Sequence, residues 1–194
     1  MFGNVLKFII SPMGFIVIPL LIMIISALKK YNNYLDVRKI VKEQYNMFKN
    51  NKSALIIIYI LPIIIAIGIA RIKTIDVEII DNVNVILSIL IAMFFSIMSI
   101  IINFENEKSE NYNKTLKETN NTIMFEILLS VFLLICTFIY MFIEKIENEI
   151  ILFAISLIIY YLSIVVLINI FILMKRMYIL YDKKENWNIM KNPI

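Results

Sequence analysis

The sequence contains no histidine, and its single cysteine, Cys136, lies inside a long apolar run. A disulfide within the chain is therefore excluded, and so is a zinc site built from cysteine and histidine. Nucleophilic catalysis by a Ser-His-Asp or Cys-His arrangement is excluded for the same reason. With only three glycines, the chain also has no P-loop or glycine-rich dinucleotide fingerprint. We expect a protein that is not an enzyme, with no catalytic residues, no cofactor and no metal site.

Charged residues are scarce as well, at 18% of the 194 residues, whereas hydrophobic residues make up 61%. Soluble domains contain roughly 45–50% apolar residues. The mean hydropathy of +0.85 also lies far from that of a water-soluble globule. The sequence therefore predicts a multi-pass integral membrane protein. Its richness in isoleucine, asparagine, lysine and tyrosine is typical of an AT-rich bacterial genome, which points to the cytoplasmic (inner) membrane of a bacterium.

Five segments are long and apolar enough to cross a hydrocarbon core, which takes about 20 helical residues. Their apolar runs are continuous, without the alternation of a barrel strand, so we expect helices. A basic linker, 29–52, joins the first two segments, and a tail, 175–194, follows the last. The sequence therefore predicts an all-α transmembrane bundle that forms one domain, 1–194. Its five expected spans are 8–28, 53–70, 83–104, 123–143 and 150–174.

The charges of the connecting segments predict the orientation. Fifteen of the 19 Lys and Arg residues lie in the linker 29–52, the loop 105–122 and the tail. The other two loops, 71–82 and 144–149, are short and acidic. Because positively charged loops stay on the cytoplasmic side, we expect the N-terminus outside and the C-terminus in the cytoplasm.

Apolar side chains of the linker recur at helical spacing and predict a short amphipathic helix; they are Val37, Val41, Tyr45 and Phe48. Lying flat, this helix would dip those side chains into the membrane interface and present lysines to anionic lipid headgroups. Lys39, Lys42 and Lys49 are the candidates for binding a headgroup or a ligand. Basic and aromatic side chains together also occur in proteins that bind nucleotides or single-stranded nucleic acid. We favour lipid as their partner and expect no binding to a nucleic acid duplex.

The fourth expected span carries a polar stripe along one face. At about 100° per residue its members fall within a narrow arc that includes Leu133. The candidate pore-lining residues of this stripe are Glu126, Ser130, Thr137, Tyr140 and Glu144. Polar groups in such a stripe turn away from lipid. Two interpretations stay open: a cation pathway repeated around a homo-oligomer, or interhelical hydrogen bonds that hold the helices together, which is the commoner outcome.

Small residues mark further faces where helices can approach closely. The third expected span carries a stripe of Asn84, Ser88, Ala92, Ser96, Ser99 and Asn103. We expect this stripe to pack on the polar stripe of the fourth span. The alternative is that both stripes line one aqueous path, with Ser96 and Ser99 as its candidates. In the second span, Pro62 predicts a kink, and its face with Tyr59, Ala66 and Ala70 suits close packing.

Three functional hypotheses follow from these patterns. The leading one is a homo-oligomeric gated ion channel. The second is a non-conducting membrane partner, which includes a transporter subunit, an immunity-type protein and an anchor for a soluble enzyme. The third is a membrane enzyme acting on lipid with Glu126 or Asp36 as acid or base, which the missing histidine and the missing carboxylate pair disfavour.

The run FIISPMGFIVIP and the basic segment KKYNNYLDVRKIVKEQYNMFKNNK, beside a compact helical core, carry a resemblance to known proteins. In architecture the chain resembles the small multi-span membrane effectors of prokaryotic anti-phage defence systems, of which the Hailong-type channel effector is the nearest analogue. The resemblance assigns no site residues. It implies an antiviral channel that stays closed until infection and then dissipates the membrane potential. A nucleotide-type ligand or a cytoplasmic partner protein would open it.

Overall fold

The computed structural model describes residues 19, 22, 37–49, 51–102, 110–141 and 149–191. These residues form helices and short connections, with no strand among them. Four of the described helical stretches are long and apolar enough to cross a membrane: Lys52–Ile72, Val77–Ile102, Tyr112–Met141 and Glu149–Asp182. The all-α class is therefore confirmed, and four of the five expected spans are present as helices. The first expected span, 8–28, lies outside the described residues except for 19 and 22.

The second expected span is one helical stretch built from α4 (Lys52–Leu55), the π-helix η1 (Ile56–Ile60) and α5 (Leu61–Ile72). It begins where the Asn51 side chain accepts a hydrogen bond from the Ala54 N–H at 3.2 Å. Pro62 lacks an N–H, and its ring crowds the carbonyl of Ile58, four residues earlier. The wider π-helical turn lies directly before this proline and accommodates it.

The other three long helices extend beyond the apolar segments expected from the sequence. Helix α6 (Val77–Ile102) begins after Asp76, whose side chain accepts from the Ile79 N–H at 2.9 Å. Helix α7 (Glu110–Met141) begins well before residue 123, and α8 (Glu149–Lys191) continues well past residue 174. The last helix therefore includes most of the tail that follows the expected span.

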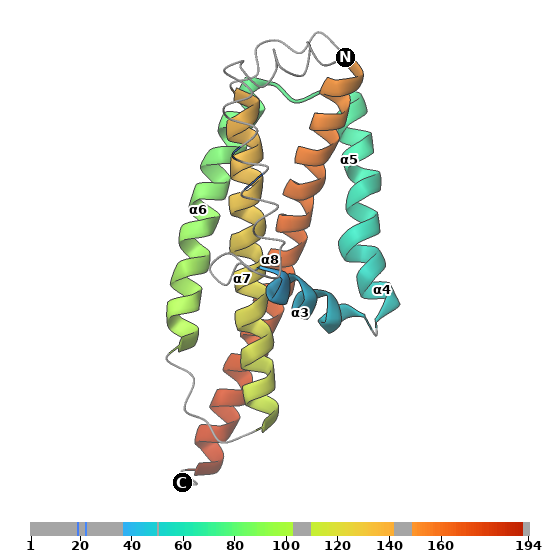
Figure 1. Ribbon diagram of the computed structural model, residues 1–194. Helices are drawn as coiled ribbons and strands as arrows, with labels where there is room; N and C mark the ends of the chain where they lie inside the picture. The colour runs from blue at the N-terminus through green and yellow to red at the C-terminus, as the bar shows by residue number, and fades with distance from the viewer. Residues whose placement is uncertain are drawn as a thin grey trace.

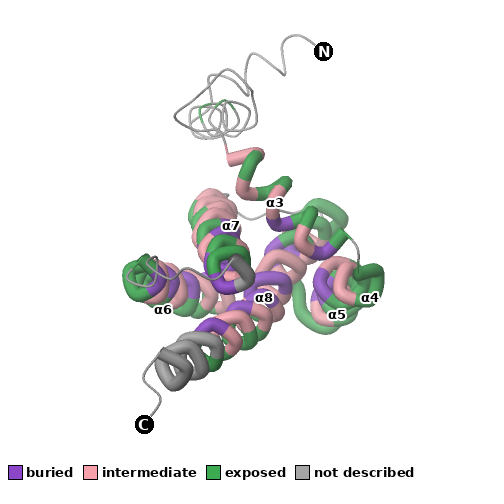
Figure 2. Tube along the Cα trace, turned by 90° about the horizontal axis from the view of Figure 1, so that it is seen from below, coloured by how far each residue is buried: buried purple, intermediate pink, exposed green. Residues whose placement is uncertain are grey.

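The long helices lie side by side in the order α6, α7, α8 and α5, with α7 the most buried of them (Figure 1). The short helix α3 (Arg38–Phe48) crosses α7 near its middle. We call the end of the helices at which α7 begins and α8 ends the α3 end, because α3 packs on the half of α7 nearer to it. The opposite end, which contains the connection 73–76, is the loop end. Seen along the helices, buried residues of α7 and α8 lie where the two helices meet, and the outer faces are exposed (Figure 2).

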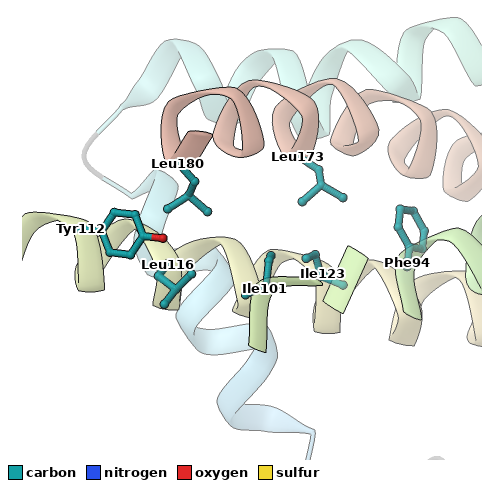
Figure 3. Close-up of a cluster of buried hydrophobic side chains, with 7 residues drawn as sticks. All are labelled: Phe94, Ile101, Tyr112, Leu116, Ile123, Leu173 and Leu180. Carbon is teal, nitrogen blue, oxygen red and sulfur yellow. The ribbon is translucent and has the colours of Figure 1, made fainter. Parts of the chain in front are cut away.

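The core between the helices divides into two apolar clusters. The α3-end cluster consists of Phe94, Ile101, Tyr112, Leu116, Ile123, Leu173 and Leu180 (Figure 3). The loop-end cluster consists of Ile75, Ile80, Leu87, Leu133 and Ile159. On the other side of α8, helix α5 buries Pro62, Ala66 and Ala70, which confirms the close-packing face expected there.

The stripe of small residues on α6 faces away from α7. Ser88, Ser96 and Ser99 are exposed, while Leu87 and Phe94 point inward. The expectation that this stripe packs on that of α7 is therefore wrong for the serines. The physical reason is that a serine hydroxyl can bond within its own helix: Ser96 donates to the Ala92 carbonyl at 3.0 Å. The larger apolar side chains fill the space between the helices instead.

Candidate functional site

The polar stripe of α7 faces the interior of the protein. Glu126, Ser130 and Thr137 are each 0% exposed, and Tyr140 is half-buried. The expectation that this stripe turns away from lipid is therefore confirmed for the residues that the structure describes. Glu144 lies outside them.

The half of the stripe nearer the loop end is held by hydrogen bonds to other helices and to the 73–76 connection. The Thr137 hydroxyl donates to the side-chain oxygen of Asn84 on α6. The Tyr140 hydroxyl donates to the Ile75 carbonyl at 3.1 Å, and the Ile75 N–H donates to Ser156 on α8 at 2.9 Å. In this half, the packing interpretation of the stripe describes the structure.

The half nearer the α3 end is polar but unpaired. Glu126 and Ser130 lie one turn apart on α7, and Asn169, 1% exposed, comes from α8. Among the described residues, none forms a hydrogen bond to either carboxyl oxygen of Glu126, to the Ser130 hydroxyl or to the Asn169 amide. The Asn169 amide lies beside the Glu126 carboxyl, within reach of a weak hydrogen-bond interaction that falls short of full hydrogen-bond geometry. We call these three residues the polar layer.

Apolar side chains cover the polar layer on both sides along the helices. Toward the α3 end, Ile123 of α7 and Leu173 of α8 belong to the α3-end cluster (Figure 3). Toward the loop end, Leu133 of α7 and Ile159 of α8 belong to the loop-end cluster. The layer is thus a narrow polar region enclosed within an apolar core.

Tyrosines approach the polar layer from the side of η1. Tyr59, on η1, lies within electrostatic range of both Glu126 and Tyr161 of α8, and both tyrosines are half-buried. π-helical turns are frequent at functional sites, and this one brings a phenol toward the buried carboxyl. Asn169 and Tyr161 are site residues that were not predicted from the sequence. The signal that could have found Asn169 is its position as the lone polar side chain in the apolar run 165–172.

The buried carboxyl of Glu126 has no basic partner among the described residues. The ion pairs in this part of the chain are Lys73–Asp76, at 2.9 Å, and Arg176–Glu118, at 3.1 Å. Within the same residues, no three His, Cys, Asp or Glu side chains gather as a metal site would require. A buried carboxylate without hydrogen bonds or a counter-charge is costly. The arrangement is therefore suited to hold a proton or a small cation.

Helix α3 packs on the first half of α7, near Asn121 and Thr122. Its buried residues are Gln44 and Phe48. Thr122, one turn before Glu126, donates to the Gln44 side chain at 3.4 Å. The Arg176 guanidinium of α8 lies 6.0 Å from the centre of the Phe48 ring, within cation–π range. Helix α3 is thereby attached to both α7 and α8 close to the polar layer.

Helix α3 forms as expected from the sequence, but its apolar side chains do not all lie on the same side of the helix. A helix is present, and Lys39, Lys42 and Lys49 are exposed as expected. Of the apolar side chains expected to share one face, Phe48 packs inward, whereas Val41 and Tyr45 are 41% and 50% exposed. The reason is that α7 contacts the face of α3 that carries Gln44 and Phe48. Val41 and Tyr45 lie outside this contact and are exposed, as the lysines are.

Comparisons with protein families, with curated proteins and with solved structures find no match for this chain. The feature of the helices that bears most directly on function is the contrast between the paired and the unpaired half of the α7 stripe.

Proposed function

We propose that this protein is a gated ion channel of the bacterial inner membrane, and that Glu126 is the cation-binding carboxylate of its pathway. The observation that carries the proposal is the full burial of Glu126 beside Ser130 and Asn169, with no basic partner and no hydrogen bond of full geometry to any of the three among the described residues. Ionisable residues inside membrane spans are expensive and commonly mark ion or proton pathways. The partnered half of the stripe contributes Thr137 and Tyr140 to the same face.

The α3 end is cytoplasmic in this proposal, with the N-terminus outside and the C-terminus inside. The exposed lysines of α3 and Lys175 of α8 support this orientation, because cytoplasmic segments are enriched in basic residues. The loop end carries Asp76, Glu78 and Asp81. Anionic headgroups at the cytoplasmic surface would then hold α3 through Lys39, Lys42 and Lys49.

The apolar clusters on both sides of the polar layer support a closed resting state. Leu133, 0% exposed, separates Ser130 from Thr137 and is the gate residue in this proposal. Opening by a nucleotide-type ligand or a cytoplasmic partner would depolarise the membrane. That is the role implied by the resemblance to small membrane effectors of anti-phage defence.

A second copy of the chain is the proposed occupant of the outer face of α6. Ser88, Ala92 and Ser96 follow one another at intervals of four residues, and all three are exposed. Small residues at this interval allow two helices in a bilayer to approach closely. This face supports a homo-oligomer in which the polar layer of each protomer remains inside its own helices.

Ion flux through liposomes containing the purified protein tests the channel. Leu133→Ser is expected to admit water between the polar regions and to raise cation flux, and Glu126→Gln in the same background is expected to lower it. Ser99→Ala is the matched control, because its hydroxyl bonds to the Phe95 carbonyl of its own helix on the exposed side of α6. If neither the wild type supplied with cytosolic nucleotide fractions nor Leu133→Ser conducts, the channel proposal is wrong.

A non-conducting membrane partner is the second candidate. It is favoured by the hydrogen bonds of Thr137 and Tyr140, which need no pathway to explain them. The α3-end extension of α8 also exposes Tyr178 and Tyr181, at 71% and 66%, as a surface for another protein. Recovery of the protein in a defined hetero-complex, together with absent flux, would favour this function over the first.

A further inference from the structure

We propose that the polar layer binds one small monovalent cation, a proton or Na⁺, in exchange with the surrounding solution. The ligands are the carboxyl group of Glu126, the hydroxyl of Ser130 and the amide oxygen of Asn169. The inference rests on the site used in the proposed function and deepens it by naming the bound species. It concerns binding alone, so it can be tested in a protein that does not conduct.

The first step of the argument is the charge of Glu126. The side chain is 0% exposed, and no lysine or arginine among the described residues pairs with it. An isolated carboxylate in such surroundings costs several kcal/mol or takes up a neutralising partner. The protein groups that could donate hydrogen bonds, from Ser130 and Asn169, stand near without bonding to it. The missing element is therefore a positive charge.

The second step is the chemistry of the ligands. Carboxylate, hydroxyl and amide oxygens are hard ligands, which suit a proton or a hard cation and not a soft transition metal. The layer contains a single acidic group, so a monovalent cation gives a neutral site, while a divalent cation would leave a buried net charge. A bound proton completes the site in the same way, because the resulting acid O–H can donate to a neighbouring oxygen.

The third step is the set of titratable groups around the layer. Tyr59 of η1 and Tyr161 of α8 are the phenols in electrostatic range of one another, and Tyr59 is in range of Glu126. On α3, Glu43 lies at the level of Asn121, whose amide can donate to it at 3.3 Å after exchange of its nitrogen and oxygen. That level is more than one turn from Glu126. Glu126 is thus the acidic group of the layer, and it is the group whose charge a bound proton or cation would neutralise.

Infrared difference spectroscopy of the protein in lipid tests the inference, because it separates a carboxylic acid from a carboxylate. Spectra are recorded while the pH is varied from about 5 to about 9 and while Na⁺ replaces a large organic cation. Glu126→Gln identifies the signal. Glu118→Gln is the matched control, since Glu118 lies two turns away on the same helix and pairs with Arg176.

A carboxylic acid band that is lost as the pH rises, and is absent from Glu126→Gln, supports proton binding. Carboxylate bands of Glu126 that shift with Na⁺ support binding of the alkali cation. In either case Asn169→Leu is expected to weaken the response about tenfold. A Glu126 signal that responds to neither pH nor Na⁺ overturns the inference. Binding without flux in liposomes would instead refute only the channel, and flux without binding would refute only the inference.

Discussion

Replacement of Glu126 by leucine should stabilise this protein. The side chain is completely buried, and neither of its oxygens bonds to a described residue. Each buried polar group left without a partner costs about 1–3 kcal/mol. Leucine is similar in size, removes that cost and packs against the apolar clusters on both sides. We expect Glu126→Leu to raise the free energy of unfolding by about 1–3 kcal/mol.

Thr137→Val is the matched comparison on the same stripe of the same helix. Thr137 is equally buried but donates a hydrogen bond to Asn84 on α6. Removal of this hydroxyl leaves the side-chain oxygen of Asn84 without its donor, while the amide nitrogen keeps its contact with Met141. Interhelical hydrogen bonds in membrane proteins contribute about 0.6 kcal/mol on average and about 1.7 kcal/mol at most. Thr137→Val is therefore expected to lower the free energy of unfolding by about that amount, opposite in sign to the effect of Glu126→Leu.

The assay is reversible unfolding in mixed micelles with increasing SDS, followed by circular dichroism. It should be repeated with and without Na⁺, because a ligand bound only by the folded state adds to its stability. The wild type is expected to gain stability from Na⁺ or from lower pH, and Glu126→Leu is expected to respond to neither. Loss of more than about 1 kcal/mol in Glu126→Leu under every ionic condition would show that the carboxyl is well bonded and would refute the reasoning.

Three further predictions follow from other parts of the structure. Leu133 belongs to the loop-end cluster, and Leu133→Ala should lower the free energy of unfolding by about 2–5 kcal/mol in the same SDS titration. A change below about 1 kcal/mol would show that the residue is not tightly packed. Replacement of the three exposed α3 lysines by glutamine should release α3 from anionic bilayers; these lysines are Lys39, Lys42 and Lys49. The release is measured with a tryptophan placed at Tyr45, whose fluorescence should no longer be quenched by quenchers attached to the lipid. Retained quenching would refute the lipid contact. The side chain of Lys73 and the Ile79 N–H lower the pKa of the Asp76 carboxyl, so its stabilising effect is present above the ordinary aspartate value of about 3.9 and is lost as the pH falls through the lowered pKa. Asp76→Asn should remove that acid-side loss in thermal scans, and an unchanged acid limb would show that other groups cause it.

The long apolar helices could be predicted from the sequence because the length of an apolar run is what makes a helix able to cross a membrane. The helix expected at 53–70 is found at Lys52–Ile72, and the one expected at 83–104 is found at Val77–Ile102. The helix ends were less predictable. Asp76 starts α6 early by capping it, and α7 and α8 continue as polar helices joined by Arg176 and Glu118. Hydropathy identifies the apolar part of a helix but does not predict how many polar turns extend that helix at either end.

The direction in which each helical face points was predictable only where burial requires it. Glu126 and Thr137 had to turn inward because lipid offers them no partner. The α6 serines carried no such requirement, since their hydroxyls bond to carbonyls of their own helix, and they point outward. For α3, the position of α7 decides that Phe48 is buried and Tyr45 is not. That position depends on tertiary contacts between segments far apart in the chain.

The two halves of the α7 stripe look alike in sequence and differ in what surrounds them. Thr137 and Tyr140 find their partners in α6 and in the connection 73–76. Among the described residues, none forms a hydrogen bond of full geometry to Glu126 or Ser130, although the Asn169 amide lies beside the carboxyl. A core shaped by stability alone would place an apolar side chain at 126, because that substitution costs no hydrogen bond and adds packing. In our proposal, a bound cation that no described residue provides explains why a carboxyl occupies this position.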